Sequence, residues 1–543
     1  MQREWTFADV WEAIADVVPE RIAQIHGARR TTWRTFDRRA DGVASALIGC
    51  GLKRQEKVAL YLHNVPEYLE SAFGCLKGGF VPVNTNYRYV RDELLYIWHN
   101  SDAAAVVFQG HFAERVDELR ARCPAVKLWV HVADGTGPCP PWAISYEHLA
   151  ASASGRTVPA WGRSGDDQII IFTGGTTGLP KGVMWRQNDL YLASNVTRDP
   201  AVADYDFVRA RVEAAAPIGL PAAPLMHGTA FVFACTILNR AGAVATVEGT
   251  RFDAISVLDM IDKEHVTDLC IVGDAFCLPI VEALERAPDR WHIADLKVVS
   301  SSGMIWSAGL KERLLTHAPN ALLIDFLNSS EASGIGRSLA SKGRVERSGK
   351  FKLGDNAFVI DEQGRHVEAG SGSIGRLAVR GHVPLGYYKD PAKSEATFPI
   401  VDGVRCAVPG DFATVDADGT IVLLGRGSVS INTGGEKVFP DEVEAVIKTF
   451  PGVRDALVVG IPDIRLGEVV AAAIELSPLS TLDVGALTAH VREELASYKV
   501  PRIVVPVDSI GRGPNGKADY SRTRAIVAEW AASRAGHIQT NRK

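Results

Sequence analysis

A loop rich in glycine and threonine, placed after a wholly apolar stretch, holds the residues of this sequence that are best suited to chemistry. The segment reads QIIIFTGGTTGLPKG over residues 168–182. Glycines accept positive φ and add no side chain, so several backbone N–H groups can converge on phosphate oxygens. Hydroxyls donate further hydrogen bonds, and a lysine supplies a point charge for a polyphosphate. The pattern predicts a phosphate-binding loop with these candidate ligands: Thr173, Gly174, Gly175, Thr176, Thr177, Gly178 and Lys181.

Other kinds of nucleotide-binding loop are disfavoured by the residues around each glycine-rich stretch. Pro180 precedes the lysine and no Ser or Thr follows it, so the loop is not of the Walker type. The GxGxxG spacing at residues 370–375 is followed by a strand-like run rather than a helix. The same spacing at residues 511–516 leaves too little chain for the further strand and acidic residue of a dinucleotide fold. A kinase, a Walker NTPase and a dinucleotide enzyme are therefore disfavoured.

The composition is that of an ordinary globular enzyme. Hydrophobic residues make up 46% and charged residues 23% of the 543 residues. The net charge of −5 gives no reason to expect a nucleic acid partner. The sequence contains no run of 18 apolar residues, so no transmembrane segment is predicted. The eight cysteines form no CxxC pair, and the N-terminus is typical of an amphipathic helix rather than a signal peptide. These features predict a cytoplasmic enzyme.

Apolar periodicity predicts alternating helices and strands that position the loop. Residues 36–47 have helical spacing, whereas residues 103–108 and 169–172 are typical of buried strands, which together indicate α/β layers. Near residue 425 the pattern changes to a compact series of its own, so we expect two domains, 1–425 and 426–543. The elements expected in the second domain are helices at 440–449 and 482–497 and strands at 455–460, 468–476 and 502–507.

The loop resembles the signature of the AMP-forming adenylate superfamily, which includes acyl-CoA synthetases, adenylation domains of peptide synthetases and firefly luciferase. Gly175 departs from that signature, in which serine is usual. Further segments resemble the other motifs of the superfamily in the right order, and they lie at 224–228, 300–305, 325–331, 409–411, 425–444 and 512–517. The resemblance implies the adenylate-forming α/β fold. In it, a large N-terminal domain of layered α/β subdomains binds ATP and the acyl group, and a small mobile α+β C-terminal domain forms a lid that carries the catalytic lysine.

The resemblance also implies roles for individual residues. Lys517, Glu331 and His227 would be the catalytic residues, with Lys517 bridging the substrate carboxylate and the α-phosphate of ATP. Glu331 and Thr176 would hold Mg²⁺, and the Asp411 carboxylate would accept hydrogen bonds from the ribose hydroxyls. The other ATP contacts that it implies, besides the loop, are Ser302, Gly303, Asp325, Phe326, Asn328, Ser330 and Arg426.

Three smaller sets complete the implied site. The CoA-side loop would consist of Gly434, Gly435 and Lys437, and the hinge would be Ser428. The residues of the implied acyl pocket are His227, Thr229, Val232, Gly273, Met304 and Trp306. These side chains are mainly small or apolar, which favours a hydrophobic acid over an amino acid, since an amino acid needs an acidic group to hold its ammonium.

The sequence departs from the superfamily pattern at the adenine and at the hinge. Leu327 and Asn328 replace the usual Tyr-Gly pair, and Phe326 would face the opposite way in an extended segment. The sequence does not identify what replaces the aromatic stack on the adenine. Ser428 and Val429 replace residues that are often charged, but a hinge needs no charge, so domain motion is still expected.

The implied reaction is that of an ATP-dependent acyl-CoA ligase that uses ATP, Mg²⁺ and CoA. The segments TGGTTGLPKGVMW, VGDAF and INTGGEKVFP most resemble bacterial ligases for sterol side-chain acids and fatty acids. CoA is the favoured acceptor because the chain has no Gly-Gly-x-Ser attachment site for phosphopantetheine. The alternatives left open are an aromatic acid as substrate, an acyl-AMP ligase with another acceptor, a luciferase-like oxygenase, and a catalytically silent nucleotide-binding scaffold. A homodimer also stays open.

Overall fold

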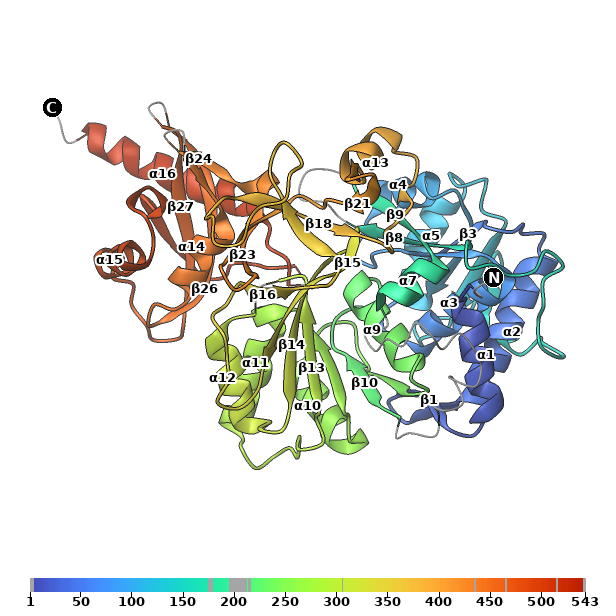
Figure 1. Ribbon diagram of the computed structural model, residues 1–543. Helices are drawn as coiled ribbons and strands as arrows, with labels where there is room; N and C mark the ends of the chain where they lie inside the picture. The colour runs from blue at the N-terminus through green and yellow to red at the C-terminus, as the bar shows by residue number, and fades with distance from the viewer. Residues whose placement is uncertain are drawn as a thin grey trace.

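The computed structural model describes residues 4–173, 179–194, 212, 216–304, 306–433, 436–463, 466–513 and 516–540. Figure 1 shows a large N-terminal part, coloured blue to yellow, and a smaller orange and red C-terminal part beside it. The predicted fold class, a large α/β N-terminal domain followed by a small α+β domain, is confirmed by this arrangement.

An eight-stranded sheet carries the start of the glycine-rich loop. Its strand order is β19-β9-β8-β4-β3-β5-β6-β7, and the pairs from β8 through β4, β3, β5 and β6 to β7 are parallel. The strands are β3 (Lys57–Tyr61), β4 (Val81–Asn84), β5 (Ala103–Gln109), β6 (Leu128–Val132), β7 (Ile144–Ser145), β8 (Gln168–Thr173), β9 (Lys181–Arg186) and β19 (Gly386–Tyr387). The strands predicted at 103–108 and 169–172 are thus β5 and β8.

The helices of the first 150 residues carry many buried aromatic and aliphatic side chains. The helix predicted at 36–47 is α2, and the amphipathic N-terminal helix is α1, whose first turn is capped by the Thr6 side chain accepting from the Asp9 N–H. The helices of this part are α1 (Phe7–Val17), α2 (Trp33–Gly49), α3 (Pro66–Gly78), α4 (Arg91–Asn100), α5 (Ala113–Arg120) and α6 (Tyr146–Ala150).

A fifteen-stranded sheet forms the rest of the N-terminal part. Strands β1, β11, β10, β12, β13 and β14 are parallel neighbours in this order, so their carboxyl ends meet at one edge of the sheet. The strands of this parallel half are β1 (Ile22–His26), β10 (Ile218–Pro221), β11 (Ala243–Thr246), β12 (Asp268–Ile271), β13 (Val298–Ser302) and β14 (Leu322–Ser329). The helices that pack with this part of the chain are α7 (Gln187–Ser194), α9 (Gly228–Leu238), α10 (Ala254–Glu264), α11 (Gly273–Arg286) and α12 (Ala308–His317).

The remaining strands of this sheet pair almost entirely antiparallel and lead toward the C-terminal part. They are β2 (Arg29–Thr32), β15 (Ala332–Ala340), β16 (Lys350–Leu353), β17 (Ala357–Ile360), β18 (Gly375–Arg380), β20 (Ile400–Val401), β21 (Val404–Ala407), β22 (Asp411–Val415) and β23 (Thr420–Arg426), with helix α13 (Pro391–Thr397) between β19 and β20. The GxGxxG at 370–375 runs into strand β18, in agreement with the sequence interpretation.

The C-terminal part has its own five-stranded sheet with apolar clusters on both faces. Its elements are β24 (Ile431–Thr433), β25 (Glu436–Val438), α14 (Pro440–Ile447), β26 (Val453–Asp463), β27 (Gly467–Leu476), α15 (Val484–Glu494), β28 (Ile503–Val507) and α16 (Tyr520–Thr540). All five elements predicted here are present within a few residues. Strand β23 ends at Arg426 in the large sheet, and the next strand, β24, belongs to the small one. We therefore keep the domain boundary at 425/426 as a proposal.

No helix of the described chain is long and apolar enough to cross a membrane.

Candidate active site

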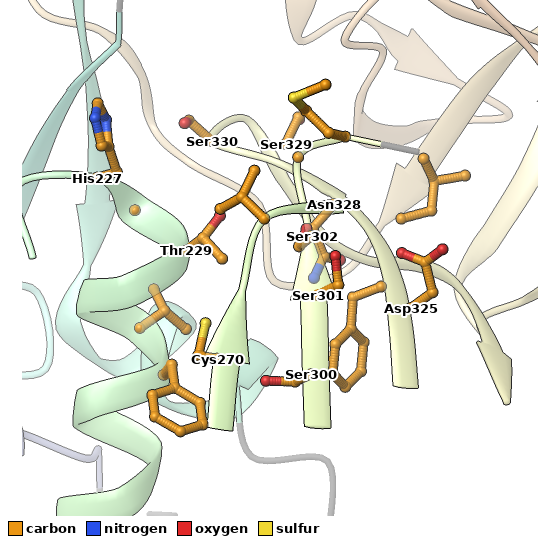
Figure 2. A pocket seen from close by; sticks show the side chains of 18 of the residues that line it. His227, Thr229, Cys270, Ser300, Ser301, Ser302, Asp325, Asn328, Ser329 and Ser330 are labelled. Carbon is orange, nitrogen blue, oxygen red and sulfur yellow. The ribbon is translucent and has the colours of Figure 1, made fainter. Parts of the chain in front are cut away.

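A cavity of about 1220 Å³ lies along β12, β13 and β14 and is also bordered by the C-terminal part. Figure 2 shows its inner wall, with His227 and Thr229 on one side and Ser302, Asn328 and Ser330 across from them. These residues lie at the end of β13, at the end of β14 or in the chain that follows β10, so the parallel arrangement of the sheet brings them together. The cavity is the place where most of the predicted site residues meet.

The glycine-rich loop begins at the rim of this cavity. Thr173, at the end of β8, lines the cavity, and its register partner is Lys181 at the start of β9. The Lys181 Nζ lies 3.1 Å from the Asp390 carboxylate and does not line the cavity. Five predicted ligands lie outside the described residues, namely Gly174, Gly175, Thr176, Thr177 and Gly178.

Glu331 is held at the cavity by two neighbouring rings. The Tyr387 hydroxyl donates to Glu331 Oε1 at 2.8 Å, and the Trp185 indole N–H donates to the preceding Ser330 carbonyl at 2.9 Å. Both Ser330 and Glu331 line the cavity. Tyr387 was missed by the sequence analysis because it lies 56 residues away in the chain, on an edge strand with no spacing pattern of its own.

The donor set around Glu331 fits a magnesium ion that arrives with a nucleotide. Mg²⁺ binds through one or two carboxylates plus substrate phosphates and keeps several of its waters. Among the described residues, no group of three or more His, Cys, Asp or Glu side chains could hold a metal without a substrate. Glu331, a carboxylate that borders the cavity, matches a magnesium site that substrate phosphates complete. Thr176, the other predicted ligand, lies outside the described residues.

His227 stands at the N-cap of α9 and lines the cavity. Burial lowers the pKa of its imidazole to about 3, and the positive charges of Lys517 and Arg88 act in the same direction. The ring is therefore neutral at physiological pH. His227 and Lys517 both line this cavity although 290 positions separate them in the sequence.

Lys517 reaches the cavity on a tight turn that docks against the N-terminal part. The Gly513 N–H donates to the Lys517 carbonyl at 2.9 Å, and the Gly516 N–H donates to the Gly513 carbonyl at 2.8 Å. A Cβ on Gly516 would lie 3.1 Å from the Met304 sulfur and from the Ala275 Cβ, so a glycine allows this close approach. The stretch at 511–516 that imitates a dinucleotide fingerprint is thus a turn that presents Lys517.

Strand β22 begins with Asp411, which lines the cavity beside helix α14 of the C-terminal part. Asp441 of α14 approaches so closely that a Cβ on Gly425 would lie 2.3 Å from its carboxylate oxygen. Burial and the Asp411 charge both raise the pKa of Asp441, whose carboxylate accepts from the Tyr520 hydroxyl at 3.3 Å. The two parts of the chain thus meet through buried polar groups.

Further charged residues of the C-terminal part border the cavity near this contact, and no role was expected for them from the sequence. Arg512 donates to the Asp455 carboxylate at 2.8 Å, and Lys448 lies 3.2 Å from the same carboxylate. Burial raises the pKa of Glu444 to about 7, with the charge of Asp441 adding to the effect. Lys448, Arg512 and Glu444 all line the cavity. Glu444 and Arg512 lie at the ends of the segments 425–444 and 512–517 that carry the resemblance, but no role was expected for either. Lys448 lies outside those segments.

The predicted adenine segment lies along β14, and its departures from the superfamily pattern have structural counterparts. Phe326 and Leu327 both line the cavity, and the β14–β15 ladder is irregular between Leu327 and Ser329. Asn328 lies at this irregularity, and its Oδ1 accepts from the Gly334 N–H at 2.7 Å. The asparagine in place of glycine therefore closes the hairpin turn.

Asp325 also borders the cavity, and its carboxylate lies 3.1 Å from Lys311 Nζ of α12. Burial raises the pKa of Asp325 to about 6, against the opposing effect of Lys311. The neighbouring strand end places Ser302 and Gly303 at the cavity, as expected for nucleotide contacts.

The predicted acyl pocket is partly assembled. His227, Thr229, Val232 and Met304 line the cavity. Gly273 does not, because its backbone N–H is turned to the Ser301 hydroxyl at 2.9 Å, and its neighbours Val272 and Asp274 face the space instead. Trp306 does not line it either, since its ring is fully buried beside Lys311.

Several predicted residues cannot be placed by side chain. Gly434 and Gly435 lie outside the described residues, and the side chains of Arg426, Ser428 and Lys437 lie outside the described part as well. The backbone of Arg426 ends β23, Ser428 lies in the short 3-10 turn at 427–429, and Lys437 lies in β25.

Two family profiles match the chain. The profile of the AMP-binding enzymes covers residues 11–388, and that of the AMP-binding enzyme C-terminal domain covers residues 442–517.

Curated relatives match over nearly the whole length. A medium/long-chain-fatty-acid–CoA/3-oxocholest-4-en-26-oate–CoA ligase of Mycolicibacterium smegmatis is 37% identical, over 99% of each chain. A protein of the same description from Mycobacterium tuberculosis is 38% identical, over 98% of each chain. A 3-oxocholest-4-en-26-oate–CoA ligase of Rhodococcus rhodochrous is 37% identical, over 97% of this chain and 96% of the relative.

Solved structures share the fold. The anthranilate CoA ligase AuaEII in complex with anthranoyl-AMP superimposes with a TM-score of 0.84 at 22% identity, covering 98% of this chain and 99% of the other. ATP-bound MatB from Rhodopseudomonas palustris gives a TM-score of 0.79 at 23% identity, covering 96% of this chain and 99% of the other.

Proposed function

This chain belongs to the AMP-binding enzyme family, and we propose that it is an ATP-dependent acyl-CoA ligase whose acid is a fatty acid or the side-chain carboxylate of a sterol. The family and the acid–thiol ligase class predicted from the sequence are confirmed by the profiles and by the CoA ligases among the relatives. The observation that carries the proposal is that Lys517, Glu331 and apolar side chains of α9 line one cavity.

The first step activates the carboxylate, which is a poor electrophile because attack would place a second negative charge on it. A carboxylate oxygen attacks the α-phosphorus of ATP, the bond from that phosphorus to the bridging oxygen breaks, and pyrophosphate leaves. Lys517 offsets charge on the carboxylate and the α-phosphate oxygens. The loss of one such preorganised charge costs roughly 10²–10³-fold in rate.

Magnesium bound at Glu331 would neutralise charge on the departing pyrophosphate. The Tyr387 hydroxyl holds the Glu331 carboxylate in place by donating a hydrogen bond to it at 2.8 Å. The neutral imidazole of His227 adds no positive charge beside the acyl carbonyl, because burial and Lys517 keep its pKa near 3.

The second step transfers the acyl group. The sulfur of CoA attacks the acyl carbonyl, the bond between that carbon and the AMP oxygen breaks, and AMP leaves while the thiol loses its proton. We call the arrangement with Lys517 in the cavity the closed arrangement. In it, Lys517 occupies the path by which the CoA thiol reaches the acyl carbonyl. The C-terminal part therefore rotates about Ser428 and brings residues 434–435 to the site. Boundary residues 425/426 mark the start of the moving domain.

The contacts at the rim between the two parts suit a reversible closure. Arg454 lies 3.6 Å from Glu282, and Arg347 lies 3.5 Å from Glu494. Both pairs are partly exposed, and exposed ion pairs contribute about 0–1 kcal/mol each. The closed arrangement is therefore held weakly enough at its rim to open in each catalytic cycle.

Exchange of labelled pyrophosphate into ATP, dependent on an added acid, tests the proposal. We expect exchange with long-chain fatty acids or with 3-oxocholest-4-en-26-oate, and a loss of at least a hundredfold in Lys517→Ala. The absence of exchange with any fatty, sterol or aromatic acid, in folded protein that binds ATP, would instead favour a silent nucleotide-binding scaffold. Exchange confined to aromatic acids would favour the aromatic-acid alternative.

A homodimer and a cytoplasmic location stay predictions, which light scattering and cell fractionation can test.

A further inference from the structure

One branch of the cavity runs as a channel between helix α9 and the face of the parallel sheet. On α9 the lining residues recur at helical spacing. The strand residues that line the same space are Asp268 and Cys270 of β12, Val298 and Ser300 of β13, and Leu322 and Ile324 of β14. Figure 2 shows Cys270 and Ser300 on neighbouring strands pointing toward α9. The helix face extends from Thr229 beside the catalytic residues to Arg240, a distance of about 16 Å at 1.5 Å per residue.

Among the described residues that line the middle of this channel, each polar donor is already used within the protein or stays neutral. Val232, Phe233 and Ile237 of α9 are apolar, and the Thr236 hydroxyl donates to the Val232 carbonyl at 2.9 Å within the helix. The Ser300 hydroxyl donates to the Leu269 carbonyl at 3.3 Å within the sheet. Burial raises the pKa of the Cys270 thiol to about 12, so this group stays neutral. The middle therefore suits a hydrocarbon.

The far end of the channel has the opposite character. Arg240, just past the end of α9, and Asp268, at the first position of β12, both line the cavity. The Arg240 Nη1 donates to Asp268 Oδ1 at 3.1 Å, and the other oxygen of that carboxylate accepts from the Thr267 hydroxyl at 2.7 Å. The Asp268 side chain is 8% exposed and the Arg240 side chain is 45% exposed, so the guanidinium stands at an opening to solvent.

We propose that Arg240 is a specificity residue that hydrogen-bonds an uncharged oxygen, such as a ketone, at the end of the acid remote from the reacting carboxylate. A guanidinium carries five N–H donors, and among the described residues the contact with Asp268 uses one of them. Asp268 holds the guanidinium in place and balances its charge. The pair therefore favours a neutral acceptor over a second carboxylate, which Asp268 would repel. The inference rests on the proposed function and names the kind of acid that this site prefers.

The test compares matched acids that differ only in the remote oxygen. Initial rates of CoA ester formation give kcat/KM for 3-oxocholest-4-en-26-oate and for the same sterol acid without the 3-oxo group. A second pair, 15-oxohexadecanoate and hexadecanoate, covers flexible chains. The readout is the ratio of kcat/KM for the oxo acid to that for its partner, in wild type, Arg240→Met and Arg240→Lys.

We expect the wild-type ratio to exceed one in at least one pair and to fall about tenfold in Arg240→Met, the loss of one hydrogen bond to a charged donor. Arg240→Lys should restore part of the ratio. Arg313→Met is the matched control, because Arg313 is 41% exposed and pairs with Glu285 at 2.7 Å away from the cavity. Its ratio should equal that of wild type.

A ratio that stays the same in Arg240→Met for both pairs overturns the inference, since the residue would then act only on structure. A wild type that forms esters but prefers the acids without the remote oxygen also overturns it and leaves the proposed function standing. A wild type that forms no ester or acyl-AMP from any of the four acids refutes the proposed function itself. Because each ratio is measured within one protein preparation, a partly unfolded variant lowers both rates and leaves the ratio interpretable.

Discussion

Gly516 offers a way to weaken the closed arrangement of the enzyme without touching a charged group of the site. Its φ is +72°, and an added Cβ would lie 3.1 Å from the Ala275 Cβ and from the Met304 sulfur. It would also lie 3.3 Å from the Val272 carbonyl oxygen, which belongs to the backbone and cannot move aside easily. Gly516→Ala should therefore overpack the contact that places the next residue, Lys517, in the cavity.

The size of the effect follows from these contacts. Overpacking costs about 1–3 kcal/mol, which corresponds to a rate loss of roughly 5- to 150-fold when the contact exists only in the reacting arrangement. Gly511→Ala is the matched control. Gly511 also has a positive φ, +65°, but its Cβ would meet the flexible end of Arg522 within the same C-terminal part. Both variants carry backbone strain, and Gly516→Ala alone crowds the N-terminal part.

The two half-reactions separate the outcomes. Pyrophosphate exchange reports acyl-AMP formation, and mixing purified acyl-AMP with CoA and enzyme reports thioester formation. We expect Gly516→Ala to lose 5- to 150-fold in exchange and at most threefold in thioester formation, with Gly511→Ala losing little in either. Equal losses in both half-reactions, or the same exchange rate in the two variants, would refute the reasoning that this contact belongs to the adenylating arrangement.

Three further predictions concern ionisation, the magnesium site and the rim. The pKa of His227 is lowered to about 3 in the folded chain, below its unfolded value near 6.5, so the unfolded state binds more protons as the pH falls below 6.5. In denaturant titrations below pH 6.5, the free energy of unfolding should fall by up to about 1.4 kcal/mol for each unit by which the pH is lowered, through the ionisation of His227. The free energy of unfolding of His227→Gln should depend less on pH between about pH 6.5 and 5. Tyr387→Phe removes the 2.8 Å hydrogen bond to Glu331 and should raise KM for magnesium-ATP by about tenfold, while an unchanged KM in steady-state assays would contradict the role of that bond. Arg454→Gln removes the exposed pair with Glu282 and should change either half-reaction by less than about fivefold, less still at high salt, so a larger loss in stopped-flow assays would mean that the rim controls closure.

Much of the fold could be predicted because its signals are local. The strand at 169–172 and the five elements of the C-terminal part follow from apolar runs and helical spacing, and β8 and α14 appear within two residues of the expected bounds. Ser302 and Glu331 became candidates through the resemblance, whose motifs occupy a few consecutive positions, and both residues line the cavity. The choice of His227 and Lys517 required the resemblance, since each alone is an ordinary surface or packed residue.

The contacts between distant segments could not be predicted. Tyr387 reaches Glu331 from a separate sheet, and Arg240 meets Asp268 across 28 positions, with no spacing that announces either pair. Gly273 was expected in the acyl pocket but does not line the cavity. Whether a residue beside a motif faces the cavity depends on backbone direction at a strand end, and the sequence does not specify that direction.

The sequence by itself determined which segments form strands and helices, and with the resemblance it determined the class of reaction. Those properties depend on neighbours within a few residues, whose side chains and φ preferences act locally. Only the tertiary structure decided that Asp441 packs on Gly425, that Gly516 brings Lys517 against Met304, and that one channel has an apolar middle and a charged end. These features are made by surfaces from segments far apart in the chain, and their distances are set only when the strands and helices pack together.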